Sequence, residues 1–153
     1  MTTIEKFKTH ITEGYTSKGE SIILGGAMLD GEALAIPVSI PLKTLNRHGL
    51  IAGATGTGKT KTIQVLSEQL SQKGVPVLMM DIKGDFSGVA KEGEEKAFIT
   101  ERHAKINIPF APKAFPVELL SLSAQEGVRL RATVSEFGPV LFSRILDLND
   151  TQA

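Results

Sequence analysis

The sequence of 153 residues contains no cysteine, which excludes disulfide bonds and thiolate metal sites and suits a reducing compartment. Basic and acidic residues are balanced at 17 each, so the chain as a whole lacks the basic excess that is typical of nucleic-acid-binding domains. No apolar run reaches membrane-spanning length, and no early run resembles a signal peptide. We therefore expect a cytoplasmic protein with no membrane partner.

Histidine chemistry is also missing. The three histidines, His10, His48 and His103, have no metal-ligand spacing, and no Ser-His-Asp or Cys-His arrangement can be built from the sequence. The hydrophobic content of 41% is nevertheless enough for one domain of this length to bury a core. The function must therefore be sought in another kind of motif.

Glycine supplies that motif. The segment Gly53-Ala54-Thr55-Gly56-Thr57-Gly58-Lys59-Thr60 matches the Walker A phosphate loop, G-x-x-x-x-G-K-S/T, at every fixed position. A short apolar run at 49–52 can form a buried parallel strand before it, and apolar residues at helical spacing follow it as far as a cap at Gly74. Because strand, glycine loop and helix occur in the required order, the segment predicts nucleotide binding.

The residue types in this loop have distinct physical roles. Glycine allows a tight turn that brings backbone N–H groups to one point, where the helix also presents its positive end. Lys59 would contact the β- and γ-phosphates as a catalytic cation, and the Thr60 hydroxyl would be a ligand of Mg²⁺. The predicted cofactors are thus ATP and Mg²⁺. The predicted nucleotide-binding residues are Gly53, Thr55, Gly56, Thr57, Gly58, Lys59, Thr60, Lys61 and Asp85.

A second apolar run, at 75–80, ends at Asp81 and is short enough to be a strand that is buried on both faces. Together with the preceding strand and helix it would complete a βαβ unit. The glycine loop and Asp81 would then meet at the carboxyl ends of neighbouring parallel strands, where such sheets bind ligands. The sequence therefore predicts an α/β fold with a parallel sheet of the P-loop NTPase type, flanked by helices.

The segment Asp81-Ile82-Lys83-Gly84-Asp85 has three interpretations. Asp81 can bind Mg²⁺ directly or through water as the partner of Thr60, which makes it the predicted metal-binding and catalytic carboxylate. Asp-x-x-Gly is also the form of the γ-phosphate sensor of GTPases, so a stand-alone nucleotide-binding switch or GTPase is the alternative function, although no Asn-Lys-x-Asp guanine-reading motif accompanies it. In the third interpretation, Asp81 and Asp85 cap and orient their own loop.

The chain before the Walker A segment has a different pattern. A weak amphipathic helix is predicted at 3–11, and apolar runs on either side of Asp30-Gly31 predict a β-hairpin at 21–40. We take residues 1–44 as a small β attachment and residues 45–153 as the nucleotide-binding domain. The further elements expected in that domain are a surface helix at 94–104, short strands at 106–110, 115–119 and 128–135, and a helix that follows Gly138-Pro139.

Four segments together resemble the HerA-like ATPases of the HerA/FtsK superfamily, and most closely a bacterial branch of that group. These segments are residues 46–60, 81–85, 131–139 and 148–152, and the resemblance covers about residues 20–153. It implies a helicase-like hydrolase that couples ATP hydrolysis to movement on DNA or to remodelling of a protein partner, as a ring-shaped homo-oligomer. DNA is a candidate partner on the resemblance alone.

One part of the superfamily pattern is missing. The resemblance implies a later apolar strand that ends in Asp-Glu and positions the metal and the attacking water, and no such strand follows Lys59. A polar sensor and an arginine finger cannot be assigned either. We therefore expect an incomplete P-loop domain, the N-terminal part of a longer protein, that binds ATP with little hydrolysis.

Overall fold

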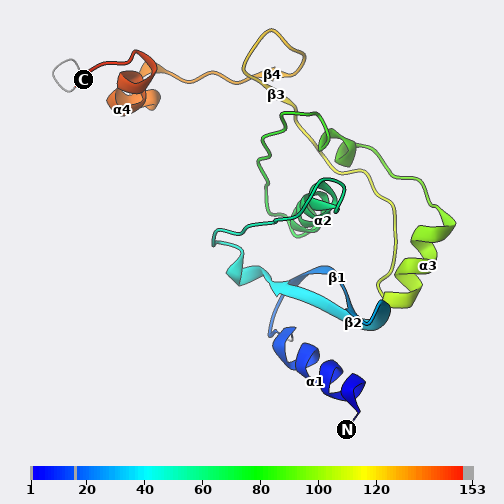
Figure 1. Cartoon of the computed structure of the whole chain (residues 1–153). Helices are drawn as coiled ribbons and strands as arrows, with labels where there is room; N and C mark the ends of the chain where they lie inside the picture. Colours follow the sequence, from blue (N-terminus) through cyan, green and yellow to red (C-terminus); the bar gives the residue numbers. More distant parts are fainter. Residues whose placement is uncertain (1, 16, 150–153) are drawn as a thin grey trace. The chain divides into compact units, whose positions relative to one another are not determined.

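The computed structural model describes residues 2–15 and 17–149, which are divided between two compact units, Met1–Pro116 and Val117–Ala153. Figure 1 shows the elements along the chain. The first unit holds α1 (Thr3–Tyr15), β1 (Ser21–Leu29), β2 (Glu32–Pro41), the 3-10 turn η1 (Leu42–Thr44), α2 (Lys59–Gln72), the 3-10 turn η2 (Ser87–Ala90) and α3 (Ala97–Ile106). The second unit holds β3 (Leu120–Ser121), β4 (Val128–Arg129) and α4 (Val134–Ile145). The domain boundary predicted at residue 44 stays a prediction.

The β-hairpin forms as predicted. Asp30 and Gly31 both have positive φ, 51° and 83°, as a two-residue type I′ turn requires, and Leu29 pairs with Glu32 across it. The ladder then slips between Ile23 and Gly25 and again between Gly26 and Met28. A Cβ at Gly26 would come within 2.6 Å of the Ile106 side chain, so glycine is needed here for α3 to approach the hairpin.

The helix that follows the glycine loop, α2, also forms as predicted. It ends in a Schellman motif, because the Gly74 N–H donates to Ser71 O and the Val75 N–H to Leu70 O, each at 3.0 Å. Gly74 has a φ of 73°, which explains why glycine occupies this position.

The side-chain amide of Gln69 attaches α2 to the hairpin. Figure 1 shows α2 beside β1. The Ile23 N–H donates to Gln69 Oε1 at 2.8 Å, and Gln69 Nε2 donates to Ile23 O at 2.6 Å. Gln69 thus satisfies both backbone groups of Ile23, as a neighbouring strand would. The adjacent Ile22 is the large side chain that is fully buried among the described residues.

The predicted parallel sheet is not among the described elements, and the fold-class prediction holds only as mixed α/β. The described residues contain an antiparallel pair, β1–β2, and a two-residue parallel pair, β3–β4. Residues 49–52 and 75–80 are not in strands, and the strands predicted at 106–110 and 115–119 are absent as well. A strand needs a hydrogen-bonding neighbour, and none of the described segments provides one at these positions.

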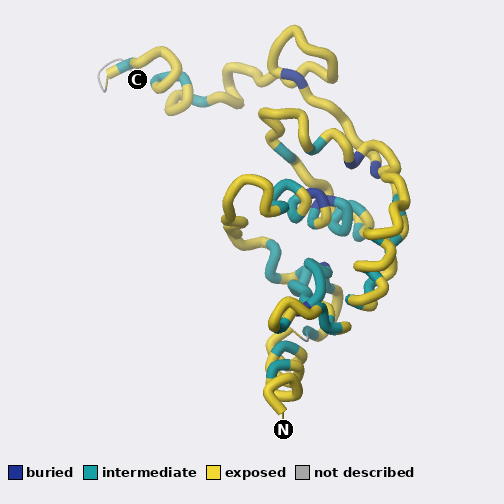
Figure 2. Tube along the Cα trace, turned by 45° about the vertical axis from the view of Figure 1, so that its right-hand side comes forward, coloured by how far each residue is buried: buried dark blue, intermediate teal, exposed yellow. Residues whose placement is uncertain are grey.

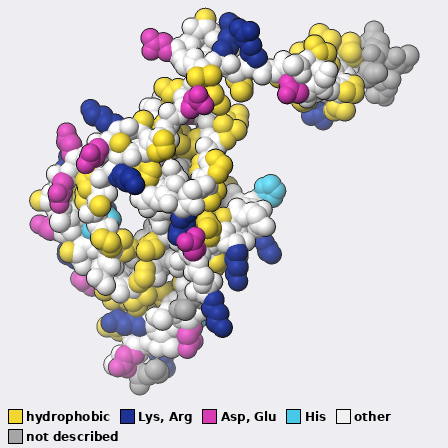
Figure 3. Space-filling view, turned by 180° about the vertical axis from the view of Figure 1, so that it is seen from behind, with side chains coloured by type: hydrophobic (Ala, Val, Ile, Leu, Met, Phe, Trp, Pro, Cys, Tyr) yellow, Lys and Arg dark blue, Asp and Glu magenta, His cyan; other side chains and the backbone are white. Residues whose placement is uncertain are grey.

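The two apolar runs consequently remain uncovered. Leu50, Leu78 and Met80 are 89%, 80% and 88% exposed. Figure 2 shows few buried positions along the tube, and Figure 3 shows hydrophobic side chains open to solvent on one face. The sequence identified these runs correctly as apolar, but apolar character by itself does not create the layer that would cover them.

The helix α4 begins five residues earlier than the Gly138-Pro139 pair predicted. Thr133 and Glu136 form a capping box: the Glu136 N–H donates to Thr133 Oγ1 at 3.3 Å and the Thr133 N–H to Glu136 Oε2 at 2.8 Å. Hydrogen bonds from Thr133 lower the pKa of the Glu136 carboxyl; the bond from the backbone N–H has the larger effect, and the bond from the hydroxyl the smaller one. Of the strand predicted at 128–135 only Val128–Arg129 forms, and its last two predicted residues belong to α4 instead. Gly138, with a φ of 67°, kinks the helix where Pro139 begins its second part.

Replacement of Gln69 by methionine tests the attachment of α2 to the hairpin. We expect Gln69→Met to lower the free energy of unfolding by about 1–3 kcal/mol, because both backbone groups of Ile23 lose their partner. Urea denaturation measures the change. The exposed Gln72 on the same helix is the matched control, and Gln72→Met should stay within about 0.5 kcal/mol of the wild type. Equal stability of the two variants would contradict the role of Gln69.

Candidate functional site

The glycine loop enters α2 through backbone conformations that favour glycine. Gly56 and Gly58 have φ of 81° and 92°, and Gly58 is the N-cap residue of α2. The Thr57 side chain closes the loop, since its Oγ1 donates to Ala54 O at 2.8 Å. A Cβ at Gly53 would lie 2.5 Å from that hydroxyl oxygen, so a side chain at position 53 would displace the hydroxyl from its bond to Ala54 O. The two fixed glycines of the Walker A pattern, Gly53 and Gly58, and the additional Gly56 are therefore explained by local geometry.

The lysine of the Walker A pattern, Lys59, folds back over its own loop. Lys59 Nζ donates to Ala54 O at 2.7 Å, which holds the ammonium beside the loop backbone at the positive end of α2. Thr60 follows in the first helical turn, where the Thr62 N–H donates to Gly58 O at 2.9 Å. A loop of this form, with a cation and a hydroxyl at a helix N-terminus, suits the phosphate groups of a nucleotide.

The second predicted segment folds around a single carboxylate. Asp81 Oδ1 accepts hydrogen bonds from the N–H groups of Lys83, Gly84 and Asp85 at 3.2, 2.8 and 3.2 Å, and Oδ2 accepts one from Phe86 at 2.8 Å. Partial desolvation raises the pKa of Asp81, but the four N–H donors outweigh it and hold the pKa below its ordinary value. Asp81 is thus ionised and organises its own loop.

For Asp81, this geometry corresponds to the third interpretation of the segment, in which the carboxylate caps its own loop; for Asp85 it does not. Both oxygens of Asp81 are already acceptors, whereas the Asp85 carboxylate has no hydrogen-bond or ion-pair partner within residues 2–15 and 17–149. No cluster of three or more metal-binding side chains occurs among the described residues. The roles of Asp81 in metal binding and catalysis stay predictions.

The loop around Asp81 is attached to α2 by a residue that the sequence did not single out. Gln64 Nε2 donates to Asp85 O at 2.8 Å, and Gln64 is only 7% exposed. The sequence could have indicated Gln64 by its position one helical turn after Thr60, on the face of α2 that also carries Ser67. A buried polar side chain at such a position needs a partner, and the Asp81 loop supplies it.

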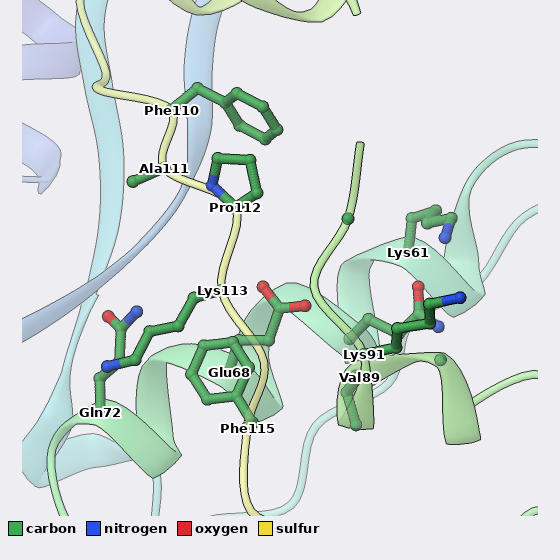
Figure 4. A pocket seen from close by; sticks show the side chains of 13 residues that line it. Lys61, Glu68, Gln72, Val89, Lys91, Phe110, Ala111, Pro112, Lys113 and Phe115 are labelled. Atoms are coloured by element: carbon green, nitrogen blue, oxygen red, sulfur yellow. The ribbon is translucent and has the colours of Figure 1, made fainter. Parts of the chain in front are cut away.

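Lys61 faces a different environment from Lys59. It lines a cavity of about 230 Å³ in the first unit, with Glu68 of the same helix between the surrounding side chains (Figure 4). Burial raises the pKa of Glu68, and Lys61 opposes this only in part. No ion pair with Glu68 within 4.0 Å occurs among the described residues. The remaining lining residues are Gln64, Gln72, Gly88, Val89, Lys91, Gly93, Phe110, Ala111, Pro112, Lys113 and Phe115.

A glycine loop that leads into a helix with Lys59 and Thr60 at its start defines the class of P-loop proteins. The family model described as Helicase HerA-like C-terminal matches residues 28–153, and the chain belongs to that family, as the sequence segments indicated. Residues 150–152, which contributed to the resemblance, lie outside the described residues.

Curated proteins with a matching segment are the DNA double-strand break repair helicases HerA of three archaea. The chain is 39% identical to that of Sulfolobus acidocaldarius, 37% to that of Saccharolobus solfataricus and 41% to that of Sulfurisphaera tokodaii, in each case over 51 residues. The match covers 33% of this chain and 10% of each relative. No solved structure matches. Within the described residues, no helix is long and apolar enough to cross a membrane.

The raised pKa of Glu68 leads to a prediction about pH. A carboxyl whose pKa is higher in the folded chain binds its proton more tightly there, so its contribution to stability falls as the pH rises through 4.5, the ordinary value, to the folded value. Glu68→Gln should therefore raise the melting temperature at pH 7, with the difference disappearing below pH 4.5. Thermal unfolding at both pH values measures this. Glu101→Gln, at an exposed position of α3, is the control and should show no such gain.

Proposed function

We propose that this chain binds ATP together with Mg²⁺ through residues 53–60, as part of a HerA-like ATPase. The observation that carries the proposal is the position of Lys59, whose ammonium lies 2.7 Å from Ala54 O at the N-terminus of α2. An ammonium held by a single loop carbonyl can exchange that contact for phosphate oxygens without a change in the backbone. The family of the chain supports the same assignment.

Each predicted site residue has a role in this proposal. Lys59 and Thr60 would hold the β- and γ-phosphates and the metal, and Mg²⁺ would neutralise phosphate charge when bound. Asp81 would act on the metal directly or through the loop that it organises, with Asp85 and Lys61 as further nucleotide contacts. The backbone N–H groups of the loop would come from Gly53, Thr55, Gly56, Thr57 and Gly58.

We further propose that the HerA-like ATPase to which this chain would belong is a DNA motor. The names of the matched archaeal relatives describe DNA double-strand break repair helicases, and this supports DNA as the partner of a ring-shaped, cytoplasmic homo-oligomer. Titration of DNA onto the full-length protein at two salt concentrations tests this part, since phosphate contacts must weaken as the salt concentration rises. Binding that is absent, or indifferent to salt, would count against DNA.

The sheet of the P-loop domain is part of the same proposal. The uncovered apolar side chains of Leu50, Leu78 and Met80 support strands at 49–52 and 75–80 that become buried when neighbouring strands pair with them and helices cover both faces of the sheet. Residues 45–153 would then belong to the nucleotide-binding domain and residues 1–44 to the β attachment. We expect the backbone amides of residues 49–52 and 75–80 to exchange more slowly in the full-length protein than in this chain. Equal exchange rates would refute the proposed strands.

Replacement of Lys59 tests nucleotide binding directly. We expect Lys59→Ala to lose at least about tenfold in ATP affinity, because a hydrogen bond to a charged group contributes about 1.5–3 kcal/mol. Its melting temperature should stay close to that of the wild type, since the ammonium contacts only the loop. Calorimetric titration measures the affinity, and the exposed Lys105→Ala on α3 is the control for loss of one positive charge. Unchanged ATP affinity in Lys59→Ala would refute the assignment.

The same variant tests hydrolysis. The chain should release phosphate from ATP at a negligible rate, because no carboxylate after Lys59 matches the expected Asp-Glu strand end and no arginine finger is assigned. Steady-state phosphate release by the chain and by Lys59→Ala should therefore be equal. A substantial rate that depends on Lys59 would contradict this and would favour Asp81 as the direct metal-binding acid.

A further inference from the structure

The buried face of α2 is polar. Gln64 and Ser67 are the buried residues of this helix, and both contact the segment that contains Asp81. Gln64 Nε2 donates to Asp85 O at 2.8 Å, and Ser67 Oγ lies 3.2 Å from Met79 Sδ. The hydroxyl of Ser67 donates its proton to Ile63 O at 2.8 Å, so its approach to Met79 is a contact, and the hydrogen bond from Gln64 is the one by which the buried face of α2 holds the Asp81 loop.

The Asp81 loop is a unit that needs such an attachment. Its four internal hydrogen bonds to the Asp81 carboxylate fix the shape of residues 81–86, but none of them connects the loop to another element. The preceding residues 75–80 are not in a strand, and residues 81–85 are exposed. Among the described residues, the bond from Gln64 is the hydrogen bond that joins residues 81–86 to the helix of the phosphate loop.

Gln64 also stands at the right place on α2. It follows Thr60 by four residues, so the two side chains lie on the same face one helical turn apart. The acceptor is a carbonyl oxygen, so the side chain of Gln64 must supply an N–H donor. Gln64 therefore connects the face of α2 that carries Thr60, the residue proposed to bind Mg²⁺, with the backbone of Asp85, whose carboxylate has no partner among the described residues.

We propose that Gln64 is a positioning residue of the nucleotide site, which sets the Asp81 loop against Thr60 so that the Asp85 carboxylate can contact the Mg²⁺–nucleotide complex directly or through water. The proposal rests on the proposed function and adds a residue and a role to it. Gln64 touches neither nucleotide nor metal; it acts through the carbonyl group of Asp85.

The experiment separates the metal from the nucleotide. ATP affinity is measured with Mg²⁺ and with EDTA, and the ratio of the two affinities is the readout. Gln64→Met keeps the length of the side chain but removes the donor. We expect the ratio to fall about threefold to tenfold in this variant, as loss of one hydrogen bond predicts, with the affinity in EDTA changed less than about twofold.

The control variant is Gln69→Met, the same chemical change on the same helix. Gln69 contacts Ile23 of the hairpin instead of the Asp81 loop, so its loss should reduce stability and leave the Mg²⁺ ratio unchanged. A ratio that falls equally in both variants would show a general loss of structure and would overturn the proposal. Gln64→Leu, which also removes the N–H donor and adds no charge, should behave like Gln64→Met and serves if the methionine variant does not fold.

A second measurement needs no nucleotide. Amide exchange of residues 83–86 should be faster in Gln64→Met than in the wild type and unchanged in Gln69→Met. If the wild type does not bind ATP, the proposed function fails and the metal role of Gln64 fails with it, while the exchange data still decide whether Gln64 holds the loop. If ATP binds but the Mg²⁺ ratio is unchanged in Gln64→Met, only the positioning role is overturned.

Discussion

The arrangement of the first unit depends on hydrogen bonds from two glutamine side chains of α2. Gln69 satisfies the backbone N–H and C=O of Ile23 in β1, and Gln64 donates to the backbone of Asp85. Both residues are amides, so they can match peptide groups in a way that apolar side chains cannot. The helix that begins with the phosphate loop thereby connects the hairpin on one side with the Asp81 loop on another.

These bonds matter because the apolar core is small. Ile22, Ala27, Val89 and Phe115 are its buried members within the described residues, whereas the apolar runs beside the phosphate loop are uncovered. Where burial contributes little, the loss of a partner for a semi-buried peptide group becomes a large fraction of the total stability. The hairpin and the Asp81 loop are therefore held mainly by specific polar contacts.

The two halves of the candidate site have different origins. The phosphate loop is built by neighbours in the sequence: Thr57 and Lys59 both donate to Ala54 O, and glycines supply the backbone conformations between them. The Asp81 loop is also locally built, by one carboxylate and four N–H groups. The spacing between the two loops has no local determinant, and the bond from Gln64 to Asp85 provides it.

The sequence by itself determined the elements whose causes lie within a few residues. The Asp30-Gly31 turn, the Gly74 cap and the glycine loop follow from φ values that glycine and aspartate tolerate. The family followed from the glycine loop together with residues 81–85, 131–139 and 148–152. The capping box at Thr133 was equally local, but the alternating apolar pattern at 128–135 suggested a strand there instead.

Only the tertiary structure decided which apolar runs become strands and which side chain bridges the two loops. A run such as 75–80 has the composition of a buried strand, yet pairing requires a neighbour that the sequence of the run does not specify. Likewise, nothing in the residue type of Gln64 or Gln69 indicates a partner 21 or 46 positions away. Local conformation depends on the residues nearest in the chain, whereas hydrogen-bond partners between distant segments depend on how those segments pack in space.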